Sequence, residues 1–261
     1  MGKKKTIYYA RTYRRLKLNL KENIIFTCIL MIPALIFMIL NIDEITSFIT
    51  VMTEQVLSKI LPDGIINVAS MDYSILNTVY FIELPTTYPG KLMIIINLVI
   101  CIVAYLVIRR MRVTGRPLAI YFLFMIFIHT VNCVFFLFAG DKFPYTTSEY
   151  SYLYLVQQVG IWLTFIVLGS LVVGFMGERG YVTKILTFIS IMAYSLVFGA
   201  IRYILYMAIL YKFSVLYMAI LFFVIGPMFD FSYFVAIYSA FVNKTIKDYD
   251  YGKKKGEWEW S

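Results

Sequence analysis

Residues 185–210 have the sequence ILTFISIMAYSLVFGAIRYILYMAIL, and this stretch decides the fold class. Its only charged residue is Arg202. As an α-helix the stretch would be about 39 Å long, whereas about 20 apolar residues are enough to cross the roughly 30 Å hydrocarbon core of a bilayer. The sequence therefore predicts a membrane-spanning helix here.

Five other stretches are similarly apolar and long enough to span a membrane. They are residues 23–40, 92–108, 118–138, 153–175 and 214–241. The last one contains Pro227, which lacks a backbone donor and is expected to kink the helix. The predicted fold is an all-α, polytopic membrane bundle of about six transmembrane helices, with its membrane domain at residues 23–243.

The composition of the whole chain agrees with a membrane protein. Of the 261 residues, 61% are apolar and 15% are charged, whereas soluble domains have roughly 45–50% and about 25%. A soluble enzyme is excluded, because such a chain would expose more apolar surface than a monomer tolerates in water. Cys28, Cys101 and Cys133 are scattered in apolar stretches and are expected to be buried hydrophobic residues. With a single histidine, His129, we expect no metal, and we assign no cofactor.

The basic residues are concentrated on one side of the predicted spans. Nineteen of the 24 Lys and Arg residues lie in the arm 1–22, in the segments after the second and fourth spans, or in the tail 244–261. The positive-inside rule then predicts a multi-pass protein of the cell membrane with both termini cytoplasmic. The net charge of +9 is explained by contact with anionic membrane lipids, and no nucleic acid partner is expected.

The two cytoplasmic ends have different patterns. The arm 1–22 combines basic residues with tyrosines and alternating leucines, which suits an amphipathic helix lying on the membrane surface, although a positive-inside tether is the favoured interpretation. The tail 244–261 contains Trp258 and Trp260 near its end. Because tryptophan is frequent at the centres of protein interfaces, these two side chains are candidates for contact with a partner; a frayed tail is the alternative.

The longest loop, residues 42–90, is predicted to lie on the outer side and is acidic. It carries six Asp and Glu residues and one Lys. Apolar residues recur at helical spacing over 45–61, so this segment is predicted to be an amphipathic helix at the outer interface, ended by Pro62. Residues 65–81 are a second apolar stretch, for which a re-entrant segment and an interfacial hairpin both stay open.

Ionisable side chains within spans are costly and are candidates for function by default. For Arg202, in the outer half of its span, two interpretations stay open: a structural ion pair or outward snorkelling, and a contact with an anion. Its candidate partners are Glu149, at the outer mouth of the fourth span, and Asp230, which the residue count places past the midplane of the sixth. For Asp230, a structural anchor near Pro227 is favoured over a proton or ion relay.

Other polar residues within the spans are expected to connect helices. Gln157 and Gln158 in the fourth span and Asn132 in the third are typical of interhelical hydrogen bonds. His129 and Cys133 share one face of the third span because they are four residues apart. Two ligands do not make a metal site, so no metal is assigned to them.

Glu149, Tyr150 and Ser151 open a span at the outer face, and Arg202 follows about fifty residues later in an apolar helix. This layout, over residues 90–240, resembles the exosortase/archaeosortase family, whose polytopic members have an outward-facing thiol transpeptidase site. In that family a Cys-Ser-Gly element begins one helix and an Asn-x-x-Arg element ends a later one. Ser151 matches the serine and Arg202 the arginine, so the resemblance makes these four residues a candidate vestigial site.

The chain departs from the family motif at the decisive position. Tyr150 stands where the family has its nucleophilic cysteine, Tyr152 replaces the glycine, and Gly199 replaces the asparagine. A phenol cannot take the place of a thiolate in this chemistry. The resemblance therefore implies a member that is not an enzyme, and no catalytic residue is assigned.

Some Gram-positive members of the family are linked to membrane glycosyltransferases that make exopolysaccharide. By analogy, the resemblance implies a non-catalytic accessory subunit of an exopolysaccharide synthase, of the β-glucan or cellulose-like kind, with the glycosyltransferase as its partner. Two alternatives stay open. They are an active exosortase-like transpeptidase, and a small transporter or channel that uses Asp230, Arg202 and Gln157.

Overall fold

The computed structural model describes residues 14–16, 20–62, 64–74, 77–110, 116–175, 180–250 and 258–260. Its long helices are α1 (Leu20–Leu40), α3 (Lys91–Arg110), α4 (Arg116–Ala139), α5 (Thr147–Gly174), α6 (Tyr181–Lys212) and α8 (Gly226–Asp250). Within the described ranges, six helical segments are long and apolar enough to cross a membrane. They coincide with the six predicted spans, so the all-α polytopic bundle is confirmed.

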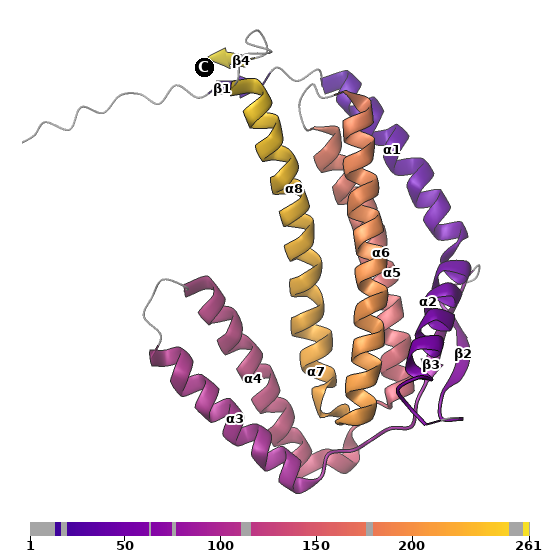
Figure 1. Ribbon diagram of the computed structural model, residues 1–261, viewed down its shortest axis with the longest axis vertical. Coiled ribbons are helices and arrows are strands. Elements are labelled where there is room, and N and C mark those ends of the chain that lie inside the picture. The colour runs from indigo at the N-terminus through magenta and orange to yellow at the C-terminus, as the bar shows by residue number, and fades with distance from the viewer. Residues whose placement is uncertain are drawn as a thin grey trace, which may run out of the picture.

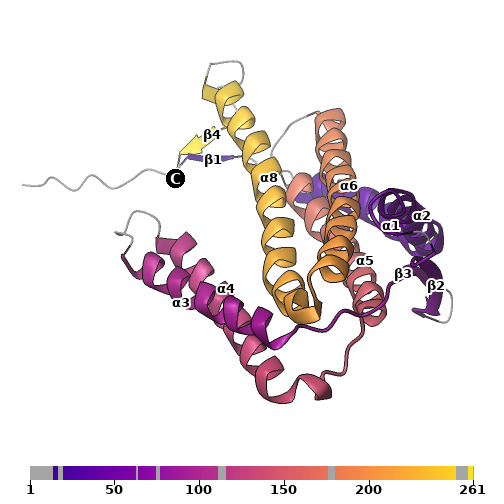
Figure 2. The same ribbon diagram turned by 60° about the horizontal axis from the view of Figure 1, so that its bottom comes forward.

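The helices form a bundle from which one helical hairpin splays away. α5 and α6 pack together at its centre, where Trp162 and Tyr203 are fully buried. α1 and then α2 (Ile42–Leu57) run along one flank of this pair, and α8 lies on another (Figure 1). The α3–α4 hairpin contacts the bundle beside α7 (Met218–Ile220), and Figure 2 also shows it diverging from α8. The bundle therefore has a packed centre and a hairpin attached near one end.

The loop after α1 begins with the amphipathic helix α2. The structure confirms this helix, although it covers Ile42–Leu57 rather than the predicted 45–61. The earlier start places Asp43 and Glu44 in the first turn, where carboxylates interact favourably with the positive end of the helix dipole. These two carboxylates favour the earlier start of α2, which the apolar spacing does not reveal.

A two-stranded antiparallel hairpin follows α2. Its strands are β2 (Asn67–Asp72) and β3 (Thr78–Glu83), and their register places Asn67 opposite Glu83. Of the two alternatives for residues 65–81, the hairpin is therefore correct and the re-entrant segment is wrong.

Side chains of α2 cover the edge of β3 that faces away from β2. The backbone N–H of Thr78 donates to Oδ1 of Asp43 at 2.9 Å. The hydroxyl of Thr50 donates to the C=O of Tyr80 at 2.9 Å, and the N–H of Tyr80 lies 3.4 Å from the Thr46 hydroxyl. These contacts satisfy backbone groups that a third strand would otherwise bind.

The sixth span is irregular before α8. A 3₁₀ turn (Val215–Tyr217), α7 and a π turn (Leu221–Ile225) precede the first residues of α8, Gly226 and Pro227. Proline cannot donate to a carbonyl four residues earlier, and a π turn is a common way to accommodate that loss. The predicted distortion is thus present, on the N-terminal side of Pro227.

The two ends of the described chain are joined. β1 (Arg14–Leu16) pairs antiparallel with β4 (Trp258–Trp260), with Leu16 opposite Trp258. Of the two interpretations of the arm, the helix is wrong for residues 14–16, which form a strand; the rest of the arm before Leu20 lies outside the described residues. The side chains of Trp258 and Trp260 are also outside them, so the proposed partner contact stays a prediction.

Candidate functional site

A buried ion pair joins α6 to α8. Nη2 of Arg202 lies 2.8 Å and 3.0 Å from the two carboxylate oxygens of Asp230, and only 4% and 2% of these side chains is exposed. Nη1 of Arg202 donates to the C=O of Gly226 at 2.6 Å, and Nη2 also donates to Oε1 of Gln158 at 2.8 Å. Of the two predicted partners of Arg202, Asp230 is correct, and the predicted interhelical role of Gln158 is confirmed.

The guanidinium of Arg202 is enclosed by aromatic rings and a glycine. Its carbon lies 6.0 Å from the ring centre of Tyr154 and 5.8 Å from that of Phe198, which is within cation–π range. The hydroxyl of Tyr154 donates to the C=O of Gly199 at 3.0 Å. A Cβ at Gly199 would approach the amide of Gln158 to 2.9 Å. The absence of a side chain at Gly199 therefore makes room for the contact between Gln158 and Arg202.

The hydrogen bonds continue from Asp230 to α6. The phenol oxygen of Tyr233 lies 3.1 Å from Oδ1 of Asp230 and 2.8 Å from the hydroxyl of Ser195. Because a phenol has one proton, Tyr233 donates to the carboxylate and accepts from Ser195. Neither residue was predicted. The available signal was that Tyr233 follows Asp230 by three residues, which places both on one face of a helix.

The arrangement favours a structural role for the charges over an anion site. Opening a buried ion pair by removing one charge is costly, because the other charge stays buried and uncompensated. Both Nη atoms of Arg202 are already bonded to oxygen atoms of the chain itself. The pair therefore acts as a clamp between α5, α6 and α8.

The clamp also fixes the level of Asp230 along the bundle. At 1.5 Å per residue, Arg202 lies about 15 Å from the Lys212 end of α6 and about 30 Å from the Tyr181 end. Asp230 lies at the same level, because the two side chains are bonded directly. The depth of Asp230 relative to the midplane of a bilayer, which the residue count places toward the cytoplasm, stays a prediction.

Glu149 does not pair with Arg202, so that alternative is wrong. Its carboxylate accepts from the backbone N–H of Thr146 at 2.7 Å, and the Thr146 hydroxyl accepts from the N–H of Glu149 at 3.2 Å. This reciprocal capping box begins α5. The Thr-x-x-Glu spacing at Thr146 is its signature in the sequence.

The other two residues of the vestigial site have separate environments. Ser151 accepts from the backbone N–H of Ile82 at 3.2 Å, and the hydroxyl of Tyr203 accepts from the same N–H at 2.9 Å. The hydroxyls of Ser151 and Tyr203 also bond each other. Tyr150 is buried, and its hydroxyl has no partner among the described residues. Ser151 therefore anchors β3 to α5 and α6.

A second polar cluster attaches the α3–α4 hairpin. Nε2 of His129 on α4 lies 3.1 Å from Oδ1 of Asn97 on α3, and the hydroxyl of Tyr217 donates to the same oxygen at 3.0 Å. The ring of His129 stacks on that of Tyr217, and Asn132 donates to the C=O of Leu216. The predicted interhelical role of Asn132 is confirmed. Within the described ranges, no three His, Cys, Asp or Glu residues form a group that could hold a metal ion.

Three other expectations have different outcomes. Lys184, counted with the cytoplasmic charges, is buried: it donates to the C=O of Gly174 at 3.0 Å and lies 3.4 Å from Oδ1 of Asn23. Cys28 is exposed, so its predicted burial is wrong. Gln157 is half-buried and lies outside the bonds of the ion-pair network.

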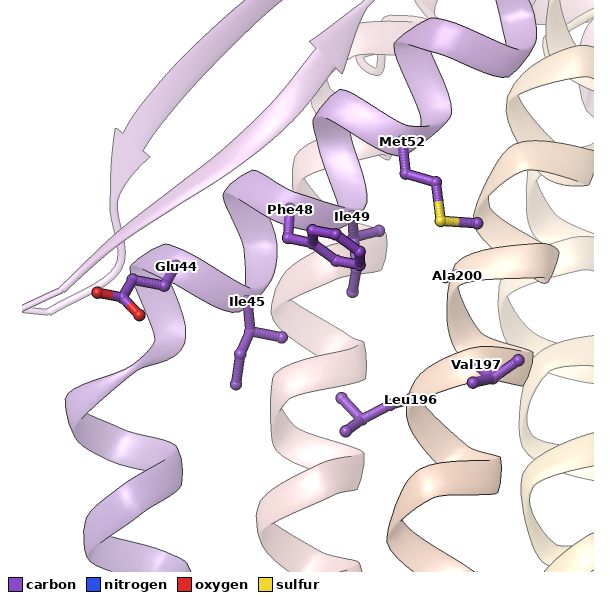
Figure 3. A pocket seen from close by; sticks show the side chains of 8 residues that line it. All are labelled: Glu44, Ile45, Phe48, Ile49, Met52, Leu196, Val197 and Ala200. Atoms are coloured by element: carbon purple, nitrogen blue, oxygen red, sulfur yellow. The ribbon is translucent and has the colours of Figure 1, made fainter.

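An apolar hollow of about 400 Å³ lies between α2 and α6. Figure 3 shows its lining, in which Glu44 at one end is the charged residue. Seven other residues complete it: Ile45, Phe48, Ile49, Met52, Leu196, Val197 and Ala200. Because its lining is almost entirely apolar, this hollow between α2 and α6 suits a hydrocarbon chain better than a polar substrate.

No protein-family model matches the chain, and no curated protein or solved structure is significantly similar to it. The resemblance to exosortases therefore stays a prediction.

Proposed function

We propose that the chain is a non-catalytic subunit of an integral-membrane complex and binds its partner through α8. The observation that carries the proposal is one exposed side of this helix, where Ser232, Ala236, Ser239, Ala240 and Asn243 follow the larger, exposed Phe229. Ser232, Ala236 and Ala240 follow one another at four-residue intervals and so share one side of α8. Contacts between transmembrane helices are rich in small residues, because these let the backbones approach closely.

The arrangement of the bundle supports an interface at this place. The α3–α4 hairpin diverges from α8 (Figure 1), and the residues of this α8 face are exposed. The ion pair of Arg202 with Asp230 fixes the first turns of α8 against α6. A rigid helix with a small-residue face is a suitable surface for another transmembrane helix.

The partner class in this proposal is a membrane glycosyltransferase that makes exopolysaccharide in the cell membrane. The resemblance to the exosortase family supports this part, together with the hydrogen bonds that engage Ser151 and Arg202 within the fold. Both termini are proposed to be cytoplasmic, as the distribution of basic residues indicates.

The test is purification of the tagged chain in mild detergent from the cells that make it, with identification of the proteins bound to it. We expect an integral-membrane glycosyltransferase, and loss of that protein when Ala236→Leu places a bulky side chain on α8. Ala193→Leu is the matched control, since Ala193 is an exposed alanine on α6. The proposal would be overturned if the chain purified as a monomer and if deleting it from the cells left polymer output unchanged.

A further inference from the structure

The strand β2 has an open edge on the side away from β3. The N–H groups of Thr78, Tyr80 and Ile82 on β3 face side chains of α2, α5 and α6. The ladder with β2 therefore uses the alternate residues of β3, and its partners on β2 include Ala69. The N–H and C=O groups of the next residue, Ser70, consequently point away from β3, as do those of the other alternate residues of β2.

This open edge contrasts with the covered edge of β3. Five of the six residues of β2 are exposed, and β2 lies at the periphery of the structure, with β3 between it and the helices (Figure 1). Among the described residues, none bonds to the outward backbone groups of Val68 or Ser70. An uncovered strand edge is a template for another strand, and proteins usually protect it with lysine, proline or a bulge. The sequence of β2, NVASMD, contains no lysine or proline.

A pocket of about 350 Å³ lies between this hairpin and the start of α5, and Met71 is the residue of β2 in its lining. The hydroxyl of Tyr152 in the pocket wall lies 3.4 Å from the C=O of Asp72, the last residue of β2. Two carboxylates and three aromatic rings are in its lining, which is formed by Met71, Phe81, Glu83, Tyr145, Ser148, Glu149, Tyr152 and Leu153. Carboxylates and aromatic rings together attract Lys and Arg side chains.

We propose that β2 binds an extended basic segment of a partner protein as an added strand, with a Lys or Arg side chain of that segment in the pocket. In this mode of recognition the backbone bonds supply affinity, and pockets beside the edge supply specificity. The charge of the loop is complementary, because residues 42–90 carry six acidic residues and one Lys. This site is separate from α8 and goes beyond the proposed function, so either can fail without the other.

The test measures binding of a labelled peptide that alternates Lys with Val to the full-length chain in detergent micelles, by fluorescence anisotropy. Ser70→Pro removes an outward N–H without removing a ladder bond, and we expect it to weaken binding about tenfold. Ser70→Ala keeps that N–H and should bind as the unmodified chain does. Glu83→Gln should weaken binding of the Lys peptide, whereas Glu54→Gln, outside the pocket lining, should not.

Hydrogen exchange of the unmodified chain provides a second measurement that needs no variant. The bound peptide should slow exchange of the Val68 and Ser70 amides. Binding without that protection, or equal binding of a peptide with Glu in place of Lys, would overturn the proposal. So would a dimer of the chain that Ser70→Pro dissociates, because the edge would then be occupied by a second copy.

Discussion

Replacing Asp230 by asparagine removes one charge of the buried pair and leaves the Arg202 guanidinium in place. With 2.8 Å between the nitrogen and the oxygen, the Coulomb attraction is about 6 kcal/mol at an effective dielectric constant of about 20. The desolvation of both ions offsets much of this attraction in the native protein, but the variant loses the attraction and still buries the arginine. We therefore expect the free energy of unfolding to fall by about 3–5 kcal/mol.

The assay is unfolding in mixed micelles by titration with a denaturing detergent, in a Trp258→Phe/Trp260→Phe background so that the fluorescence reports Trp162, which is fully buried on α5. Asp141→Asn is the control, because Asp141 is exposed and its loss should change stability by less than about 0.5 kcal/mol. The double variant Arg202→Met/Asp230→Leu should recover at least about 2 kcal/mol relative to Asp230→Asn, since it leaves no buried charge. An Asp230→Asn variant as stable as the Asp141→Asn control would refute the clamp.

Two further predictions concern single contacts. Gly199→Ala should displace Gln158 from the guanidinium and lower the free energy of unfolding by about 1–3 kcal/mol. Gly160→Ala should be neutral or stabilising by the same titration, because a Cβ there meets nothing within 4 Å. Ser151→Ala should cost about 0.5–1.5 kcal/mol and speed hydrogen exchange of the Ile82 amide. Unchanged exchange at Ile82 would show that Ser151 does not anchor the hairpin.

The spans were predictable because each depends on the composition of one continuous segment. A stretch such as 185–210 must be a helix in hydrocarbon, where every backbone group has to be satisfied internally. The partner of Arg202 could be narrowed to Glu149 or Asp230, because a charge inside a span needs a partner of opposite charge. The choice between the candidates depended on which face of each helix turns inward.

The β-hairpin and the role of Ser151 depended on contacts between distant segments. The exposed strand β2 gives no clear alternation of apolar and polar residues, so its sequence could not exclude a re-entrant segment. Ser151 bonds a backbone N–H of Ile82, 69 residues earlier, and no side-chain pattern reveals a backbone acceptor. Glu149 is different, because the Thr-x-x-Glu spacing of its capping box with Thr146 is visible in the sequence.

The ion pair also has a consequence for how the chain is made. Arg202 and Asp230 are 28 residues apart on consecutive spans, so the ribosome completes α6 before the carboxylate is available. An unpaired arginine at the centre of a span disfavours its release into lipid by about 2.5–3.5 kcal/mol, and Arg202, which lies nearer the Lys212 end of α6, imposes a smaller cost of the same sign. The last two spans should therefore leave the insertion machinery as a pair, with α6 held at the translocon until α8 has emerged.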